Sequence, residues 1–208
     1  MINPIERFRE NINRARHFSN MYVSLEKSTT NVVDVSDILR AEIIMEVSAL
    51  DNYVHEVVRV GMVQIFKGER QKTEMYKKFE IPLDHIPNVE DEEKGYRWFE
   101  FLVKNKHSHE TFQNPNKINS AIRLVLDVNN IWDEIARETK DSTGKELRNR
   151  MSLIVDRRNK IAHESDRDRS KQTGRWPIDQ QMVEDSLDFI DWSVEKIDSK
   201  ISLKKDRM

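Results

Sequence analysis

The sequence predicts an all-α protein, built as an antiparallel helical bundle with a helical insertion. Apolar residues recur every three or four positions over long stretches, which is the spacing of one face of a helix. Glycine and proline, five of each among 208 residues, are too few for the closely spaced turns of a β-sandwich. Hydrophobic residues make up 37% of the chain, enough for one core, so we expect a single domain over residues 1–208.

The first two helices have the clearest signals. Asn3 is a helix-capping residue and Pro4 suits the first helical position, so the first helix should begin there. Its expected buried stripe consists of Ile5, Phe8, Ile12, Ala15, Tyr22 and Leu25. A second helix is expected over residues 36–66, ended by Gly68. Its apolar residues have an average spacing of 3.6 and are Leu39, Ile43, Val47, Leu50, Val54 and Val57.

Residues 69–112 are predicted to form the insertion, packed on the bundle. We expect a short helix over residues 71–79, a connection bracketed by prolines over residues 81–87, and a helix over residues 96–103. The aromatic residues of the last helix could stack on nucleic-acid bases, but such density is more typical of a core. They are Tyr96, Trp98, Phe99 and Phe101.

Three more helices follow. One restarts at Asn114 and continues, after a break at residues 129–130, over residues 131–137. Thr143 and Glu146 form a capping box that opens the next helix, whose core residues are Leu147, Met151, Ile154 and Val155.

A polar loop over residues 164–175 leads to the last helix, which Asp179 can cap while Ile178 packs on Val183. The core stripe of that helix is Val183, Leu187, Ile190, Val194, Ile197 and Ile201.

Composition excludes several classes of site. The chain has no cysteine, which excludes disulfides, cysteine-type zinc sites and thiol catalysis. His107 and His109 stand two apart, so on a helix they point away from each other, and we expect no metal and no cofactor. Apolar runs are far shorter than the roughly 20 residues of a membrane span, and the first residues do not resemble a signal peptide. These patterns predict a cytoplasmic protein without a membrane contact.

Charge is unevenly distributed. The net charge is −2, yet residues 140–175 contain eleven Lys and Arg against six Asp and Glu. This basic third favours an anionic partner such as RNA.

Within the basic third, Arg158 and His163 are the residues with the most specific chemistry. Arg158 falls on the apolar stripe of its helix, where an unpaired charge is costly. On a regular helix, residues five apart are rotated by about 140° from each other. The two side chains therefore meet one ligand only if the helix relaxes near Ala162, or if a second subunit completes the site.

Such a pair suits RNA cleavage by the adjacent 2′-hydroxyl, which needs a base, an acid and a cation for the developing phosphorane charge. Histidine transfers protons near neutral pH, and arginine supplies a permanent charge with donors matched to phosphate. Asn159 could hold a ring nitrogen of His163 or bind the substrate. A structural interpretation stands beside this one, with His163 favoured by the helix dipole and Arg158 paired with Asp51 or Glu56.

The segment Arg158-Asn159-Lys160-Ile161-Ala162-His163 resembles the signature of the HEPN superfamily (higher eukaryotes and prokaryotes nucleotide-binding domains). That signature is an Arg, four to six residues and then a His, usually with a polar residue directly after the Arg. Residues 49–56, ALDNYVHE, are similar to its RiboL-PSP-like branch. The resemblance covers residues 36–66 and 145–197. It implies a helical bundle that dimerises through the motif helices, and metal-independent endoribonuclease activity, common in toxin–antitoxin and phage-defence systems.

By this resemblance Arg158 and His163 match the catalytic pair and Asn159 the polar residue. One branch has a tyrosine two residues after the histidine that a partner nucleotidyltransferase modifies, but this chain has Ser165 there. The predicted function is therefore metal-independent RNA cleavage by a homodimer. The alternative is a catalytically silent module that binds RNA or protein. An antitoxin or defence protein is an expected partner.

Further residues are assigned supporting roles. Five positively charged residues near the motif are expected to bind RNA phosphates. These are Arg157, Lys160, Arg167, Arg169 and Lys171. Asp51 and His55 share one face of the second helix, four residues apart. They are expected either to lie behind the motif and support its residues, or to remain a solvated pair.

Overall fold

The computed structural model describes residues 3–30, 33–83, 86, 95–139, 142–172 and 174–203. Over these residues the chain forms eight α-helices, with one isolated β-bridge between Arg167 and Arg175. The predicted all-α class is confirmed. The helices are α1 (Pro4–Ser28), α2 (Asp37–Phe66), α3 (Glu74–Lys77), α4 (Arg97–His107), α5 (Pro115–Ile122), α6 (Ile131–Ala136), α7 (Gly144–Glu164) and α8 (Gln180–Leu203).

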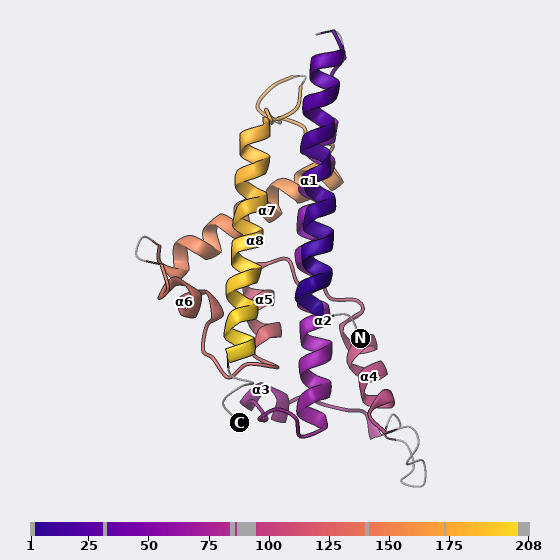
Figure 1. Ribbon diagram of the computed structural model, residues 1–208, viewed down its shortest axis with the longest axis vertical. Helices are drawn as coiled ribbons and strands as arrows, with labels where there is room; N and C mark the ends of the chain where they lie inside the picture. The colour runs from indigo at the N-terminus through magenta and orange to yellow at the C-terminus, as the bar shows by residue number, and fades with distance from the viewer. Residues whose placement is uncertain are drawn as a thin grey trace.

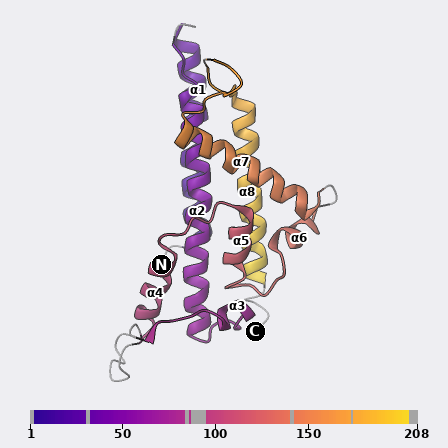
Figure 2. The same cartoon turned by 180° about the vertical axis from the view of Figure 1, so that it is seen from behind.

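Three long helices, α1, α2 and α8, form the body of the molecule (Figure 1). α1 runs antiparallel to α2, since Ser19 bonds Glu42 while Arg7 bonds Glu56. α8 runs in the same direction as α2, and hydrogen bonds join Ser186 to Glu46 and Tyr53 to Asp198. The fourth long helix, α7, crosses the others obliquely (Figure 2), which brings its C-terminal end to the start of α2.

The predicted apolar stripes build the core. The stripe residues predicted for α2, α7 and α8 are buried, and so are those of α1 up to Ala15. Leu25 is an exception, because the last turns of α1 project beyond the neighbouring helices (Figures 1 and 2). Tyr22 is partly buried against a second, smaller cluster of Leu39, Ile43 and Val183, on which Ile178 also packs.

Local signals set most helix boundaries as expected. The side chain of Asn3 accepts a hydrogen bond at the start of α1, and Thr143 and Glu146 form the predicted capping box. The carboxylate of Asp179 accepts from the backbone N–H of Met182, 2.8 Å away. Gly68 has a φ of +76°, the left-handed conformation that commonly follows the end of a helix.

Residues 69–112 differ in detail from the prediction. α3 is a single turn, while α4 extends to His107. Of the predicted connection over residues 81–87, residues 84, 85 and 87 lie outside the described residues. Phe99 is buried and stacks on Phe66 of α2, with 4.6 Å between ring centroids, so its core assignment is confirmed. Phe101, two residues on and therefore on the opposite side of α4, is 66% exposed. Among the described residues, no helix is long and apolar enough to cross a membrane.

Candidate functional site

The backbone of α7 remains helical through Glu164. The N–H groups of Ser165 and Asp166 both donate to the carbonyl of Lys160, the second over 3.0 Å. Ser165 and Asp166 then turn the chain with φ angles of +53° and +56°. These two bonds close the end of the helix, which continues past Ala162 to Glu164, so the described chain does not bring Arg158 and His163 together by a break at Ala162. Within one chain the two side chains leave α7 about 140° apart.

The motif side chains differ in their surroundings. Arg158 is partly buried and donates from Nη1 to Oδ1 of Asn159 at 3.1 Å, while its Nε is buried without a hydrogen-bond partner in the described part of the chain. The Oδ1 atom of Asn159 thus serves Arg158 rather than His163. His163 is exposed at the end of the helix, beside the loop.

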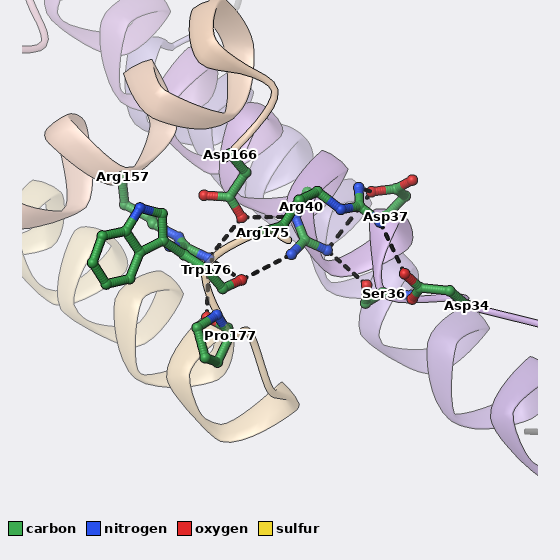
Figure 3. Close-up of polar contacts among 9 residues, drawn as sticks. All are labelled: Asp34, Ser36, Asp37, Arg40, Arg157, Asp166, Arg175, Trp176 and Pro177. Carbon is green, nitrogen blue, oxygen red and sulfur yellow. Dashed lines mark hydrogen bonds and ion pairs between the residues drawn. The ribbon is translucent and has the colours of Figure 1, made fainter. Parts of the chain in front are cut away.

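A buried ionic cluster lies directly behind the motif, and we call it the Asp166 cluster. Asp166 is fully buried, and its Oδ2 accepts from Nε of Arg40 and Nη2 of Arg157, both at 2.8 Å (Figure 3). The carbonyl of Trp176 accepts from Arg40 at 3.0 Å and from Arg157 at 3.2 Å. Arg157 also donates to the carbonyl of Pro177 at 3.0 Å. The cluster therefore fixes the segment after α7 to both α2 and α7.

A second contact holds the same segment to the start of α2. Arg175 forms ion pairs with Asp37 and with Asp34, the latter at 2.8 Å (Figure 3). Because Arg175 directly precedes Trp176, the chain is held on both sides of the Asp166 cluster.

Burial governs the electrostatics of the cluster. Desolvation lowers the pKa of the Arg157 guanidinium, an effect that the charge of Asp166 opposes and that of Arg40 reinforces. Arginine stays charged at neutral pH under such a shift. Oδ1 of Asp166 and Nε of Arg157 are buried without hydrogen-bond partners among the described residues. The cluster thus concentrates two positive charges against one carboxylate beside the motif.

The expected pairing of Arg158 with Asp51 or Glu56 is not present among the described residues. A buried arginine–carboxylate pair does exist, but the arginine is Arg157 rather than Arg158, and its partner is Asp166 in the loop. Glu56 instead forms ion pairs with Arg7 and Arg59.

Asp51 and His55 lie away from the motif. The backbone N–H of Phe112 donates to Oδ1 of Asp51, and Nε2 of His55 lies 3.2 Å from the carbonyl of Glu110. They stand eleven and fifteen residues beyond Arg40 on α2, which at 1.5 Å per residue is roughly 16–22 Å. They lie 3.9 Å from each other, between Nε2 of His55 and Oδ1 of Asp51, as a partly exposed pair. The chain therefore places them as a pair away from its own motif rather than behind it.

The residues expected to bind RNA divide into two groups. Arg157 is occupied by the Asp166 cluster. The others are exposed, although Arg169 pairs with Glu164 at 3.1 Å and Lys171 with Asp168 at 3.3 Å. Arg167 has no ion pair among the described residues. The exposed cations therefore lie on α7 and on the loop that follows it.

Sequence reasoning missed Arg40 and Asp166. Arg40 directly follows the core residue Leu39 of α2, so a charge at the edge of an apolar stripe was a usable signal. Asp166 carried no signal, since it is one of several charged residues in a polar loop, 126 residues from Arg40.

The family model RiboL-PSP-HEPN matches residues 9–203 of the chain. The protein belongs to the RiboL-PSP-HEPN family. Comparison with curated proteins and with solved structures finds no match. The HEPN match extends across residues 69–112, which the resemblance seen in the sequence did not cover, and membership indicates an RNase-like or RNA-related function. No group of three or more His, Asp or Glu in the described ranges could hold a metal ion.

Proposed function

We propose that this HEPN protein is a metal-independent endoribonuclease that acts as a homodimer, with Arg158, Asn159 and His163 in its active site. The observation that carries the proposal is that α7 stays helical from Arg158 through His163. It directs Arg158 and His163 apart, so a composite site needs the motif of a second chain. The guanidinium of Arg158 has no carboxylate partner among the described residues, which leaves its charge for such a site.

Apolar surface beside the motif supports the dimer. Leu153 of α7 is 69% exposed and Met182 of α8 is also exposed. Both line one shallow depression with Ile43, Ile154 and Arg157. A two-fold contact through this surface would bury these side chains and place two copies of α7 together.

The proposed reaction uses the substrate as its own nucleophile. A His163 imidazole removes the proton of the 2′-hydroxyl, whose oxygen attacks the neighbouring phosphorus, and the departing 5′-oxygen takes a proton from solvent. Arg158 stabilises the extra negative charge of the phosphorane. The products are a 2′,3′-cyclic phosphate and a 5′-hydroxyl.

Substitutions test the chemistry. His163→Ala should lower the cleavage rate by about 10²-fold or more, the usual contribution of a positioned acid–base group. Its stability should stay within about 1 kcal/mol of the parent, because the side chain is exposed. His17→Ala, at an exposed histidine of α1, is the matched control and should cleave normally. Cleavage should persist in excess EDTA, and end-group analysis should find the cyclic phosphate.

Mixing inactive variants tests the composite site. Arg158→Ala and His163→Ala should each be inactive alone. If the site takes Arg158 from one chain and His163 from the other, half of the randomly mixed dimers carry one intact site, and the mixture should recover about a quarter of the parental activity.

Leu153→Glu should give a monomer in sedimentation and abolish cleavage. Full activity of a monomer would exclude the composite site.

The exposed loop cations should position the substrate. RNA binding should weaken steeply with added salt, and charge reversal at Arg167 and Arg169 should weaken binding to all RNA sequences alike. A role as a toxin or phage-defence effector predicts that expression is toxic and that His163→Ala removes the toxicity. Salt-dependent RNA binding with no cleavage would instead identify a catalytically silent binding module.

A further inference from the structure

Trp176 is an exposed aromatic residue on a fixed backbone. Its N–H donates to the carbonyl of Asp166 at 2.9 Å, and its carbonyl accepts from the two arginines of the Asp166 cluster. Pro177 follows, and its ring fixes φ there. Despite these restraints on the main chain, the side chain is 37% exposed. Figure 3 shows the indole beside the cluster, with no hydrogen bond drawn to the ring.

Folding alone would favour burial of the Trp176 ring over its exposure. A tryptophan side chain buries 150–250 Å² when it enters a core, roughly, and that burial is strongly favourable. Trp132 in this chain shows that outcome, since it is fully buried and its indole N–H donates to the carbonyl of Pro115 at 2.9 Å. The indole N–H of Trp176 has no hydrogen-bond partner in the described part of the chain. The polar edge of the ring therefore has no partner within the described ranges, and part of Trp176 is exposed to a ligand.

Positive charge and the motif lie next to the ring. Nζ of Lys160 is 5.5 Å from the centroid of the Trp176 ring. His163 is three residues further along α7, so its Cβ lies about 5–6 Å from that of Lys160 on the same side of the helix. A planar group stacked on Trp176 would therefore place an attached anionic group near Lys160 and His163.

We propose that Trp176 stacks on an unpaired nucleobase next to the scissile phosphate, which makes single-stranded RNA the substrate class. Stacking on aromatic side chains is how proteins bind unpaired bases, and a duplex hides the base faces that stacking needs. Lys160 then neutralises the adjoining phosphate. This stacking role rests on the proposed ribonuclease function, because it assigns the substrate of that same site.

Binding to a probe that cannot be cleaved separates stacking from catalysis. The probe is a single-stranded 2′-O-methyl RNA, which lacks the nucleophilic hydroxyl, with its complementary duplex as the second probe. Trp176→Ala should weaken single-strand binding about tenfold or more, while Trp176→Phe should keep most of the affinity. Duplex binding should be equally weak for the parent and Trp176→Ala. Thermal denaturation should show both variants folded, because the contacts of residue 176 in the Asp166 cluster are made by its main chain.

Phe101→Ala is the matched control. Phe101 is more exposed than Trp176, but it lies on α4, which packs on the opposite end of α2 from the Asp166 cluster (Figure 1). Its loss should leave single-strand binding unchanged. In fluorescence titrations, the single strand should quench the parent, and Trp176→Phe should remove that quenching.

Several outcomes overturn the stacking role. These are unchanged single-strand affinity in Trp176→Ala, an equal loss in Phe101→Ala, or no rescue by phenylalanine. A change of sedimentation in Trp176→Ala would assign the ring to a contact between copies of the chain. If the parent binds single strands through Trp176 but does not cleave unmodified RNA, stacking stands and the ribonuclease proposal fails. If Trp176→Ala cleaves RNA as fast as the parent, the ribonuclease proposal stands and the stacking role fails. A parent that binds no RNA overturns both proposals.

Discussion

Asp166→Asn should be strongly destabilising. The change removes the charge that compensates Arg40 and Arg157, while asparagine keeps the shape of the side chain. Asparagine also tolerates the left-handed backbone at this position, where φ is +56°, so the substitution adds little backbone strain. The measured effect therefore reports the electrostatics of the Asp166 cluster.

The magnitude follows from the burial of the two guanidinium groups. The side chain of Arg40 is 8% exposed and that of Arg157 is 18% exposed. Leaving a buried charge uncompensated costs about 3–5 kcal/mol. Both arginines keep their hydrogen bonds to the carbonyl of Trp176. Arg40 also keeps an ion pair with Asp37 at 3.7 Å, and Arg157 keeps some contact with solvent. We therefore expect the lower end of the range, about 3 kcal/mol.

Urea denaturation at neutral pH, followed by far-UV circular dichroism, measures this loss. The control is Asp168→Asn in the same loop. Asp168 is also buried, but its partners are the nearby Ser170 and the exposed Lys171. This control should lose only about 1 kcal/mol. If Asp166→Asn cost no more than the control, the two arginines would not depend on this carboxylate, and the reasoning would be refuted.

Three other substitutions have defined outcomes. Burial raises the pKa of the Glu46 carboxyl from 4.5 to about 8. As pH rises, the unfolded chain therefore loses this proton at a lower pH than the folded chain. The free energy of unfolding should fall by roughly 5 kcal/mol between about pH 4.5 and 8. Glu46→Gln should remove that slope from urea midpoints measured across this pH range. Gly61→Ala would place a Cβ 2.6 Å from Cγ1 of Val125, so the melting temperature should fall, with a cost of about 1–3 kcal/mol. Thr143→Ala should cost about 1 kcal/mol in thermal denaturation, because it removes the capping box with Glu146.

Local patterns predicted most of the helices, because a buried stripe and its caps are encoded within a few residues. The stripe of α8 and the capping box of α7 are examples, and both are confirmed. The same patterns cannot show where a neighbouring helix ends, so Leu25 was assigned to the core. Nor do they show how helices cross, which decides that Asp51 and His55 lie away from the motif.

Charged residues limited the prediction of the site. Glu42 and Glu46 were not expected inside the protein, yet both are buried and accept hydrogen bonds from Ser19 and Ser186. These partners come from α1 and α8, so only the packed helices reveal them. The motif itself was found because its residue types match a known signature. The Asp166 cluster behind it was not found, because its members are far apart in the sequence.

That separation has a consequence for the order of events during synthesis. Arg40 leaves the ribosome early, but its acceptors on Asp166 and Trp176 follow 126 and 136 residues later. Segments fold as they emerge, from the N-terminal side onward. The loop after α7 therefore cannot take up its conformation until residues 166–177 have been made. A nascent chain that already carries Arg158 and His163 lacks the anchored loop and its tryptophan. For a protein proposed to cut RNA, this delay would keep unfinished chains inactive beside the messenger that encodes them.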